Sequence, residues 1–313
     1  MVWSILGAGA IGQLFATRFI DAKIPIRLLL RDAILEDYYQ LHRIQGKETR
    51  HYQLPVDPAD ASTPIKYLLV CTKAPDTLNA LKQYQHRILP EADIVLLQNG
   101  MGQHEQVQAM LPKASIWAGI TTAGAWRDRD HHTDLQQLHC VSEGVTEIGC
   151  LSRTSVLLPP GLENCDPKIN LSSNISLSLW RKLAINCAIN PLTAIHQCLN
   201  GELVKKPELL ANMQQVCEEI EQLFARLELH LFDKSVFETA KQIAIATGDN
   251  RSSMLTDRLN KRPTEIDYIT GHICRTAKQV GIGVPFNQQL LSDVKKLSSI
   301  QCHVTLDRHS PLR

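Results

Sequence analysis

The feature that most constrains this chain is the glycine-rich segment Gly7-Ala8-Gly9-Ala10-Ile11-Gly12, which lies between a short apolar run, Val2–Leu6, and an amphipathic stretch, Ala10–Asp21. A strand that leads through three glycines into a helix is typical of a β-α-β unit, because the first glycine allows the tight turn and the third allows close helix packing. The second glycine lets a phosphate approach the backbone, where the unpaired N–H groups of the helix start face it. We therefore expect a dinucleotide pyrophosphate to bind at Gly7, Ala8, Gly9, Ala10, Ile11 and Gly12.

The rest of the first half alternates short apolar runs with helical patterns, as in a parallel sheet covered by crossover helices. Asp76–His86 predicts a second crossover helix, and residues from about 139 to 149 predict a further, turn-linked pair of strands. We therefore predict an α/β fold that begins with a Rossmann-type, doubly wound domain. Its predicted strands are Val2–Leu6, Ile26–Leu30, Tyr67–Cys71, Asp93–Leu97 and Ile116–Thr121.

The second half reads as helices. Helix breakers are concentrated between Leu158 and Pro167, and beyond them apolar residues recur at intervals of three and four. We predict a cofactor-binding domain over residues 1–171 and an all-helical domain, which binds substrate and carries catalysis, over residues 172–313. The predicted buried faces belong to Leu209–Leu229, to Phe286–Leu297, and to a helix that carries Ile266, Ile269, Ile273, Ala277 and Val280.

Composition narrows the function classes. Thirty-three Lys and Arg against thirty-two Asp and Glu give a net charge of +1, which supplies no field for nucleic acid or an anionic membrane. No apolar run approaches the roughly 18 residues that a membrane-spanning helix needs. The start of the chain does not resemble a signal peptide, so we expect a cytoplasmic protein. The nine cysteines form no C-x-x-C pair or zinc-like spacing, and with the isolated His131-His132 they predict no metal site.

Three residues after predicted strands face the expected cofactor. In NAD-binding units an acidic residue about 20 positions beyond the glycines holds the ribose. Arg31 stands there instead, and because a guanidinium forks well onto phosphate it favours NADP, with Asp32 as the alternative ribose ligand. Lys73 is either a phosphate contact or a surface lysine. Asn99, in the segment Gln98-Asn99-Gly100-Met101-Gly102, can both donate to a ligand and accept from it, although a plain Asn-Gly turn also explains the dipeptide.

The most informative stretch of the second half is Trp180–Pro191. Lys182, Asn186 and Asn190 are four apart, so on a helix they form one polar stripe among apolar residues. Such a stripe needs partners, which are either neighbouring backbone and buried water or a substrate. In the second interpretation, burial lowers the pKa of Lys182, which protonates an oxygen that gains charge as hydride arrives.

Two downstream segments carry further polar groups. Ser252 and Ser253 precede an apolar pair, and they are either helix caps or ligand contacts. Glu265 lies near the start of the helix with the buried isoleucines. It is either a favourable charge in a first helical turn or a functional carboxylate.

These motifs, together with Asn200-Gly201-Glu202-Leu203, resemble the ketopantoate reductase (2-dehydropantoate 2-reductase) family over nearly the whole chain. The resemblance implies an NADP-dependent oxidoreductase, and a helical second domain like that of 6-phosphogluconate dehydrogenase. NADPH would reduce the C2 carbonyl of ketopantoate to give pantoate, for pantothenate and coenzyme A biosynthesis. The molecule would be a monomer or a homodimer with a small-molecule substrate, and with no nucleic-acid or membrane partner.

The resemblance also assigns roles to residues. Lys182 acts as general acid, and Glu265 contacts the substrate hydroxyl and the cofactor. Arg31, Lys73, Asn99 and Ala125 match positions near the cofactor, although Thr121–Ala125 departs from the usual family residues. The implied substrate contacts are Asn99, Lys182, Asn186, Asn190, Asn200 and Ser253. Two alternatives stay open: a paralogous NADPH-dependent reductase of another branched 2-oxo acid, and a non-catalytic NADP-sensing protein.

Overall fold

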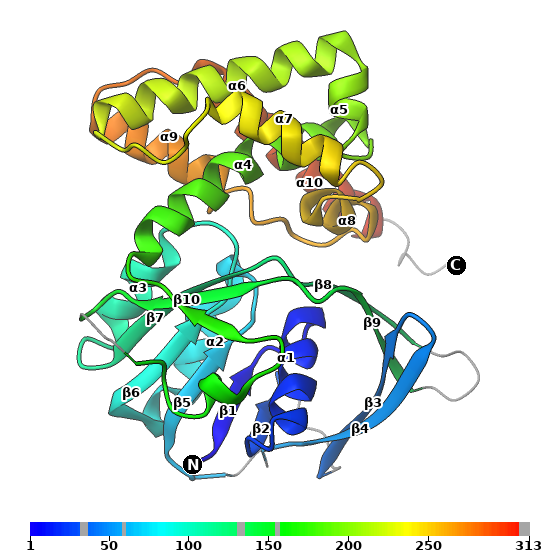
Figure 1. Ribbon diagram of the computed structural model, residues 1–313, viewed down its shortest axis with the longest axis vertical. Helices are drawn as coiled ribbons and strands as arrows, with labels where there is room; N and C mark the ends of the chain where they lie inside the picture. The colour runs from blue at the N-terminus through cyan, green and yellow to red at the C-terminus, as the bar shows by residue number, and fades with distance from the viewer. Residues whose placement is uncertain (32–36, 58–60, 130–134, 154–156, 307–313) are drawn as a thin grey trace, which may run out of the picture. The chain divides into compact units, whose positions relative to one another are not determined.

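The computed structural model describes residues 1–31, 37–57, 61–129, 135–153 and 157–306 (Figure 1). These residues form two compact units. The first contains Met1–Gln98 and Gln103–Ser176, and the second contains Asn99–Gly102 and the residues from Leu177 onward. The turn Asn99–Gly102 therefore packs with the helices of the second unit. We keep the domain limits of 1–171 and 172–313 as a prediction.

The first unit is built on a seven-stranded sheet in the order β11-β10-β7-β6-β5-β1-β2. Five neighbouring strands run parallel to one another, namely β2, β1, β5, β6 and β7, and β10 runs antiparallel to β7. This arrangement confirms the predicted Rossmann-type sheet. The strands are β1 (Trp3–Leu6), β2 (Ile26–Leu29), β5 (Ile65–Val70), β6 (Ile88–Leu96), β7 (Ser115–Thr121), β10 (Thr146–Cys150) and β11 (Ile169–Leu171).

Helices cover both faces of this sheet (Figure 1), because its strands are apolar on both sides. Phe15 and Phe19 of α1 pack with Trp3 on one face, whereas Leu81 of α2 and Val107 of α3 pack with Leu68 on the other. This burial is the main stabilisation of the unit. The helices are α1 (Ala10–Asp21), α2 (Thr77–Tyr84) and α3 (Gln103–Met110), with short 3-10 turns at η1 (Ala74–Asp76), η2 (Gln85–Arg87) and η3 (Leu162–Asn164).

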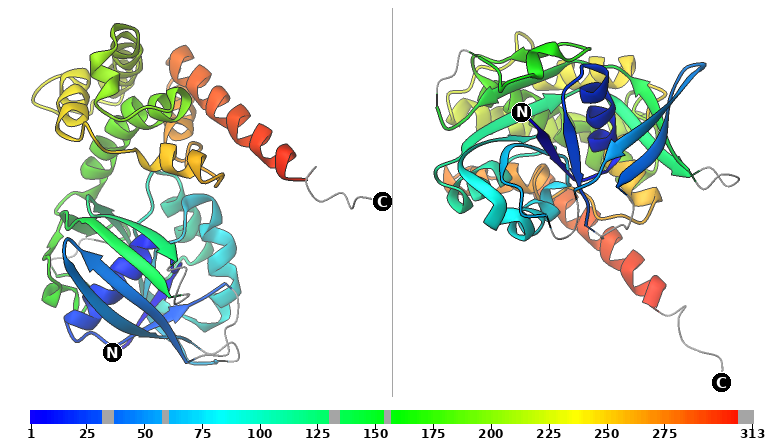
Figure 2. Two further views of the ribbon diagram at one scale, coloured as in Figure 1. Left: turned by 90° about the vertical axis from the view of Figure 1, so that its right-hand side faces the viewer. Right: turned by 90° about the horizontal axis from the view of Figure 1, so that it is seen from below.

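A second, four-stranded sheet in the order β4-β3-β9-β8 was not predicted (Figure 2). Its inner face packs Leu41, Leu54 and Leu138 into the same core as α1. The two strands expected near residues 139–149 are confirmed as β9 and β10, and the structure adds that each joins a different sheet. The strands are β3 (Tyr38–Gln45), β4 (Glu48–Pro55), β8 (Gly124–Arg129) and β9 (Gln136–Ser142).

Every regular element in the described residues of the second unit is a helix, as predicted. The central helix α4 buries Leu183, Cys187 and Leu192, and α6 buries Met213 and Ile220. The helices are α4 (Ile175–His196), α5 (Glu202–Lys205), α6 (Pro207–Arg226), α7 (Val236–Ala246), α8 (Ser253–Leu259), α9 (Thr270–Gln279) and α10 (Pro285–Leu306). None of the helices searched in the described chain is long and apolar enough to cross a membrane.

One predicted helix start is wrong. Ile266 and Ile269 precede α9, which begins only at Thr270. The carbonyl of Tyr268 accepts a hydrogen bond from the Met101 N–H at 2.8 Å, so the turn before α9 is bonded to another segment. Glu265 therefore lies in a turn, and not in a first helical turn.

Candidate functional site

The glycine-rich segment has the backbone that a phosphate-binding turn needs. Gly7 has a φ of +99°, and a Cβ there would lie 2.6 Å from the Thr72 backbone nitrogen. A Cβ on Gly12 would lie 2.0 Å from the Gly7 carbonyl oxygen. Nothing lies within 4 Å of the Cβ position on Gly9, so that glycine is open to an approaching group. Two glycines are required by packing and one leaves space, which fits a bound pyrophosphate.

Two side chains that the sequence did not assign to a site hold this segment. The Ala8 carbonyl oxygen accepts hydrogen bonds from Arg127 Nη1 at 2.7 Å and from Gln13 Nε2 at 3.2 Å. Ala125 lies two residues before Arg127 on β8, and it is half-buried against the core that contains α1. A cationic side chain therefore lies beside the phosphate-binding turn. Only tertiary structure brings it there.

Two of the other predicted cofactor residues, Arg31 and Lys73, follow the carboxyl ends of β2 and β5, which flank β1 and run parallel to it. Arg31 follows β2 with 77% of its side chain exposed, and its Nη2 lies 3.9 Å from Asp76 Oδ2. Lys73 is half-buried immediately before η1. Asp32, the alternative ribose ligand, lies outside the described residues.

In the second unit, α4 carries the predicted polar stripe. Lys182 and Asn186 are half-buried, and Asn190 is buried among the apolar residues of the helix. The helix continues through Pro191 to His196. Asn190 therefore lies deep in the unit, and the stripe becomes more accessible toward Lys182.

The Lys182 ammonium has an altered acidity. Burial lowers the pKa of Lys182 to about 8, and the nearby carboxylate of Glu265 acts in the opposite direction. Glu265 is itself buried. A lysine with a pKa near 8 can both hold and release a proton near neutral pH, as a general acid requires.

Asn99 completes this group. Its Nδ2 donates to Glu265 Oε2 at 3.1 Å. The turn that carries it is tightly packed, because Gly100 has a φ of +87° and a Cβ there would lie 2.3 Å from the Tyr268 carbonyl oxygen. The structure thus brings together Asn99, Lys182 and Glu265, three residues from three separate segments.

Nearby hydrogen bonds fix the side chains of Asn200 and Ser252, whereas Ser253 is exposed. Asn200 is buried, and its Nδ2 donates to Thr247 Oγ1 at 3.0 Å. Ser252 caps α8 by accepting from the Leu255 N–H at 3.0 Å, and its hydroxyl lies 2.7 Å from that of Thr193 on α4. The capping interpretation is therefore confirmed for Ser252. Ser253 is the first residue of α8 and is exposed, so its side chain is accessible to a ligand.

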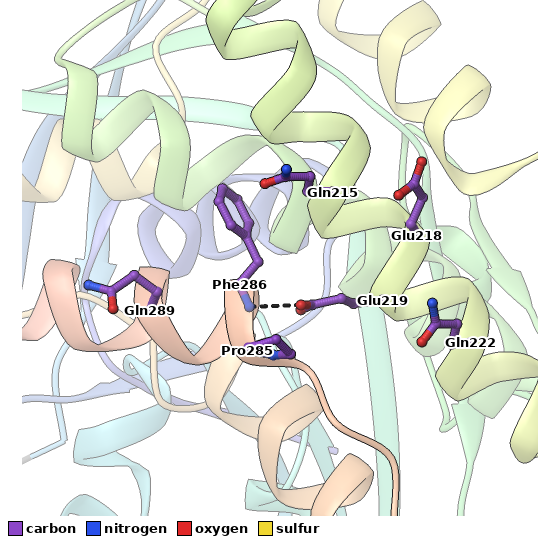
Figure 3. A pocket seen from close by; sticks show the side chains of 7 residues that line it. All are labelled: Gln215, Glu218, Glu219, Gln222, Pro285, Phe286 and Gln289. Atoms are coloured by element: carbon purple, nitrogen blue, oxygen red, sulfur yellow. Dashed lines mark hydrogen bonds between the residues drawn. The ribbon is translucent and has the colours of Figure 1, made fainter.

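A surface hollow on α6 and two buried cysteines lie outside the group formed by Asn99, Lys182 and Glu265. A surface hollow of about 420 Å³ is lined by Glu219 and Phe286 (Figure 3), but Glu219 Oε1 accepts the Phe286 N–H at 2.7 Å and so caps α10. Burial raises the pKa of Cys165 and Cys217 to about 12, which leaves both thiols protonated. Among the described residues, no three His, Cys, Asp or Glu side chains are grouped for a metal ion.

Comparison with known proteins gives consistent matches over both units. The family model described as "Ketopantoate reductase PanE/ApbA" matches residues 3–153, and "Ketopantoate reductase PanE/ApbA C terminal" matches residues 174–298. The 2-dehydropantoate 2-reductase of Escherichia coli O157:H7 is 33% identical over 300 residues, which are 95% of each chain.

Solved structures share the fold. A PanE/ApbA family ketopantoate reductase from Ralstonia eutropha JMP134 has a TM-score of 0.85 at 25% identity, covering 97% of this chain and 100% of that one. A D-mandelate dehydrogenase with NADH and anilino(oxo)acetate has a TM-score of 0.82 at 22% identity, covering 96% and 99% of the two chains. At that identity, the second likeness supports the fold alone.

Proposed function

This chain belongs to the ketopantoate reductase family, and we propose that it reduces ketopantoate to pantoate with NADPH as the hydride donor. The observation that carries the proposal is the half-buried Lys182, whose neighbouring Glu265 and pKa of about 8 suit proton donation to a carbonyl oxygen. The reaction would serve pantothenate and coenzyme A biosynthesis in the cytoplasm.

The chemistry of the second unit follows from three side chains. When bound, NADPH supplies the hydride that reduces the C2 carbonyl of the substrate. Lys182 Nζ donates a proton to the carbonyl oxygen as that oxygen gains negative charge. Glu265 raises the pKa of Lys182 against the effect of burial, and so keeps the ammonium populated near neutral pH. Asn99 holds the Glu265 carboxylate through its 3.1 Å hydrogen bond.

In this proposal the other residues that were predicted as substrate contacts in the second unit bind the substrate. Amide and hydroxyl groups suit a ligand with one carboxylate and two oxygen substituents, because they donate and accept without adding charge. Asn186 and Asn190 present amides on the same helix as Lys182, and Ser253 presents an exposed hydroxyl. Asn200 is held by Thr247 with its side-chain oxygen buried.

The first unit binds the cofactor in this proposal. The open backbone at Gly9 faces the pyrophosphate, and the unpaired N–H groups at the start of α1 bind its oxygens. Arg31 binds the 2′-phosphate, Lys73 adds a point charge, and Ala125 lines the site. Arg127 adds charge beside the turn.

The decisive experiment measures NADPH oxidation by the purified chain with and without ketopantoate. We expect turnover only when ketopantoate is present, and much weaker turnover with NADH. Turnover with another branched 2-oxo acid but not with ketopantoate would contradict the substrate assignment and leave the proton-transfer mechanism intact. NADPH binding without turnover of any 2-oxo acid would favour the non-catalytic sensor.

A further inference from the structure

The contact between Arg31 and Asp76 lies where the proposed cofactor site meets solvent. β1 lies between β5 and β2, so the segments that follow β5 and β2 meet beyond the end of β1. There Arg31 Nη2 lies 3.9 Å from Asp76 Oδ2, with 77% and 54% of the two side chains exposed. A carboxylate thus lies beside the guanidinium that would bind a 2′-phosphate.

The backbone around both residues is fixed, although the side chains are exposed. The Tyr84 hydroxyl of α2 donates to the Leu30 carbonyl oxygen at 2.9 Å, which ties α2 to the residue before Arg31. Thr77 Oγ1 donates to the Lys73 carbonyl oxygen at 3.1 Å and closes the turn that carries Asp76. The proximity of Arg31 and Asp76 therefore follows from the packing of α2 at this sheet edge.

The fold makes little other use of the Asp76 carboxylate. Asp76 stands at the start of α2, but its side chain makes no capping hydrogen bond there. An exposed ion pair at this distance contributes little to stability. Replacing the carboxylate by an amide of the same shape should therefore leave the fold intact.

We propose that Asp76 tunes the choice between NADPH and NADH by competing with the 2′-phosphate for Arg31. This inference rests on the proposed cofactor site. To bind NADPH, Arg31 must exchange the Asp76 carboxylate for the phosphate, and the phosphate then lies near a like charge. NADH has no 2′-phosphate and leaves the pair undisturbed. Asp76 thus weakens the binding of NADPH but not of NADH, and so reduces the preference for NADPH that Arg31 creates.

The test compares Asp76→Asn with wild type by titrating NADPH and NADH, followed by cofactor fluorescence in the absence of any 2-oxo acid. We expect the Kd for NADPH to fall about three- to tenfold at low salt, and the Kd for NADH to change less than about twofold. Added salt should reduce the gain. Glu91→Gln, which removes the same charge from an exposed site on β6, is the matched control and should change neither Kd.

Arg31→Ala separates the pair from a general charge effect. If Asp76 acts through Arg31, most of the NADPH gain from Asp76→Asn disappears in the Arg31→Ala background. An unchanged Kd for NADPH in Asp76→Asn, or equal tightening of both cofactors, would overturn the inference while the proposed function stands. Failure of the wild-type chain to bind NADPH would instead overturn the cofactor assignment on which the inference depends.

Discussion

The side-chain amide of Asn99 donates a hydrogen bond to the carboxylate of Glu265 at 3.1 Å, although 166 positions separate the two residues in the chain. A second bond fixes the same pair of segments, because the Met101 N–H donates to the Tyr268 carbonyl oxygen at 2.8 Å. The carboxylate that opposes the lowered pKa of Lys182 is therefore held by a turn from a distant part of the sequence. Its orientation depends on both segments.

Asn99→Asp should impair the proposed reaction more than Asn99→Ala. Alanine removes one charge-assisted hydrogen bond, which should lower kcat/KM about tenfold or more. Aspartate places a second carboxylate against Glu265, and two carboxylates so close resist simultaneous ionisation. Steady-state kinetics with ketopantoate checks the order. Asn260→Asp, at an exposed position after α8, is the matched control, and equal activity of Asn99→Asp and wild type would contradict the assigned contact.

Removing the Lys182 ammonium should abolish proton donation and spare cofactor binding. Lys182→Ala should lower kcat about 10²- to 10⁴-fold, because a positioned general acid contributes that much. The Kd for NADPH should stay within about twofold of wild type, since the predicted cofactor contacts are mainly in the first unit. Kinetics and cofactor titration on the same sample check both statements. A large loss of NADPH affinity would assign Lys182 to cofactor binding.

The pH dependence should follow the Lys182 pKa of about 8. Ketopantoate reduction needs the protonated amine, so kcat/KM should be level below pH 8 and fall above it. Pantoate oxidation needs the neutral amine and should show the opposite dependence. Glu265 raises the pKa of Lys182, so in Glu265→Gln the fall in kcat/KM for ketopantoate reduction should begin at lower pH. A fall that begins at higher pH in Glu265→Gln would contradict this electrostatic role.

The strands of the main sheet were predictable because their signal is local. β1, β2 and β7 are short apolar runs, and α1 has the predicted bounds Ala10–Asp21. The four-stranded sheet was missed because its inner face is only partly apolar. Arg43 occupies an inward position of β3, where it pairs with Asp21 at 2.8 Å, and so interrupts the alternation beside Leu41. A charged residue at an inward position hides the strand pattern in the sequence when the residue that neutralises it, here Asp21, lies on another element.

The candidate site was predictable to the extent that one element carries it. Lys182, Asn186 and Asn190 could be grouped from spacing alone, because four residues on a helix return to nearly the same direction. The hydrogen bond between Asn99 and Glu265 depends on how distant segments pack, which spacing does not encode. The contact between Arg127 and the Ala8 carbonyl was missed for the same reason.

Gly100→Ala should disturb both the fold and the proposed site. Its φ of +87° disfavours a side chain, and the added Cβ would lie 2.3 Å from the Tyr268 carbonyl oxygen, so the turn must move. We expect a loss of about 2–4 kcal/mol in the free energy of unfolding, together with lower kcat, because Asn99 is displaced from Glu265. Gly46→Ala is the control. Gly46 has a φ of +60° with nothing within 4 Å, so its substitution should cost about 1 kcal/mol and leave kcat unchanged.

Arg87→Met should destabilise the first unit far more than the same change at Arg50. Arg87 Nη2 lies 2.5 Å from Asp57 Oδ2, and both side chains are 4% exposed. Removal of one partner from a buried ion pair leaves an uncompensated charge, which costs about 3–5 kcal/mol. Arg27 lies 3.5 Å from the other Asp57 oxygen and should keep the loss near the lower limit.

Arg50 is the matched control because it pairs with Glu48 at 3.3 Å in an exposed setting, where solvent screens the two charges and the pair contributes little to stability. Chemical denaturation followed by tryptophan fluorescence measures both variants, since Trp3 and Trp117 are buried in the first unit. Equal unfolding free energies for Arg87→Met and Arg50→Met would contradict the prediction, because they would mean that the Asp57 carboxylate is not buried without a partner when Arg87 is removed. A larger loss at Arg87 would show that its ion pair with Asp57 holds the residues that follow β4 against η2, the short turn before β6.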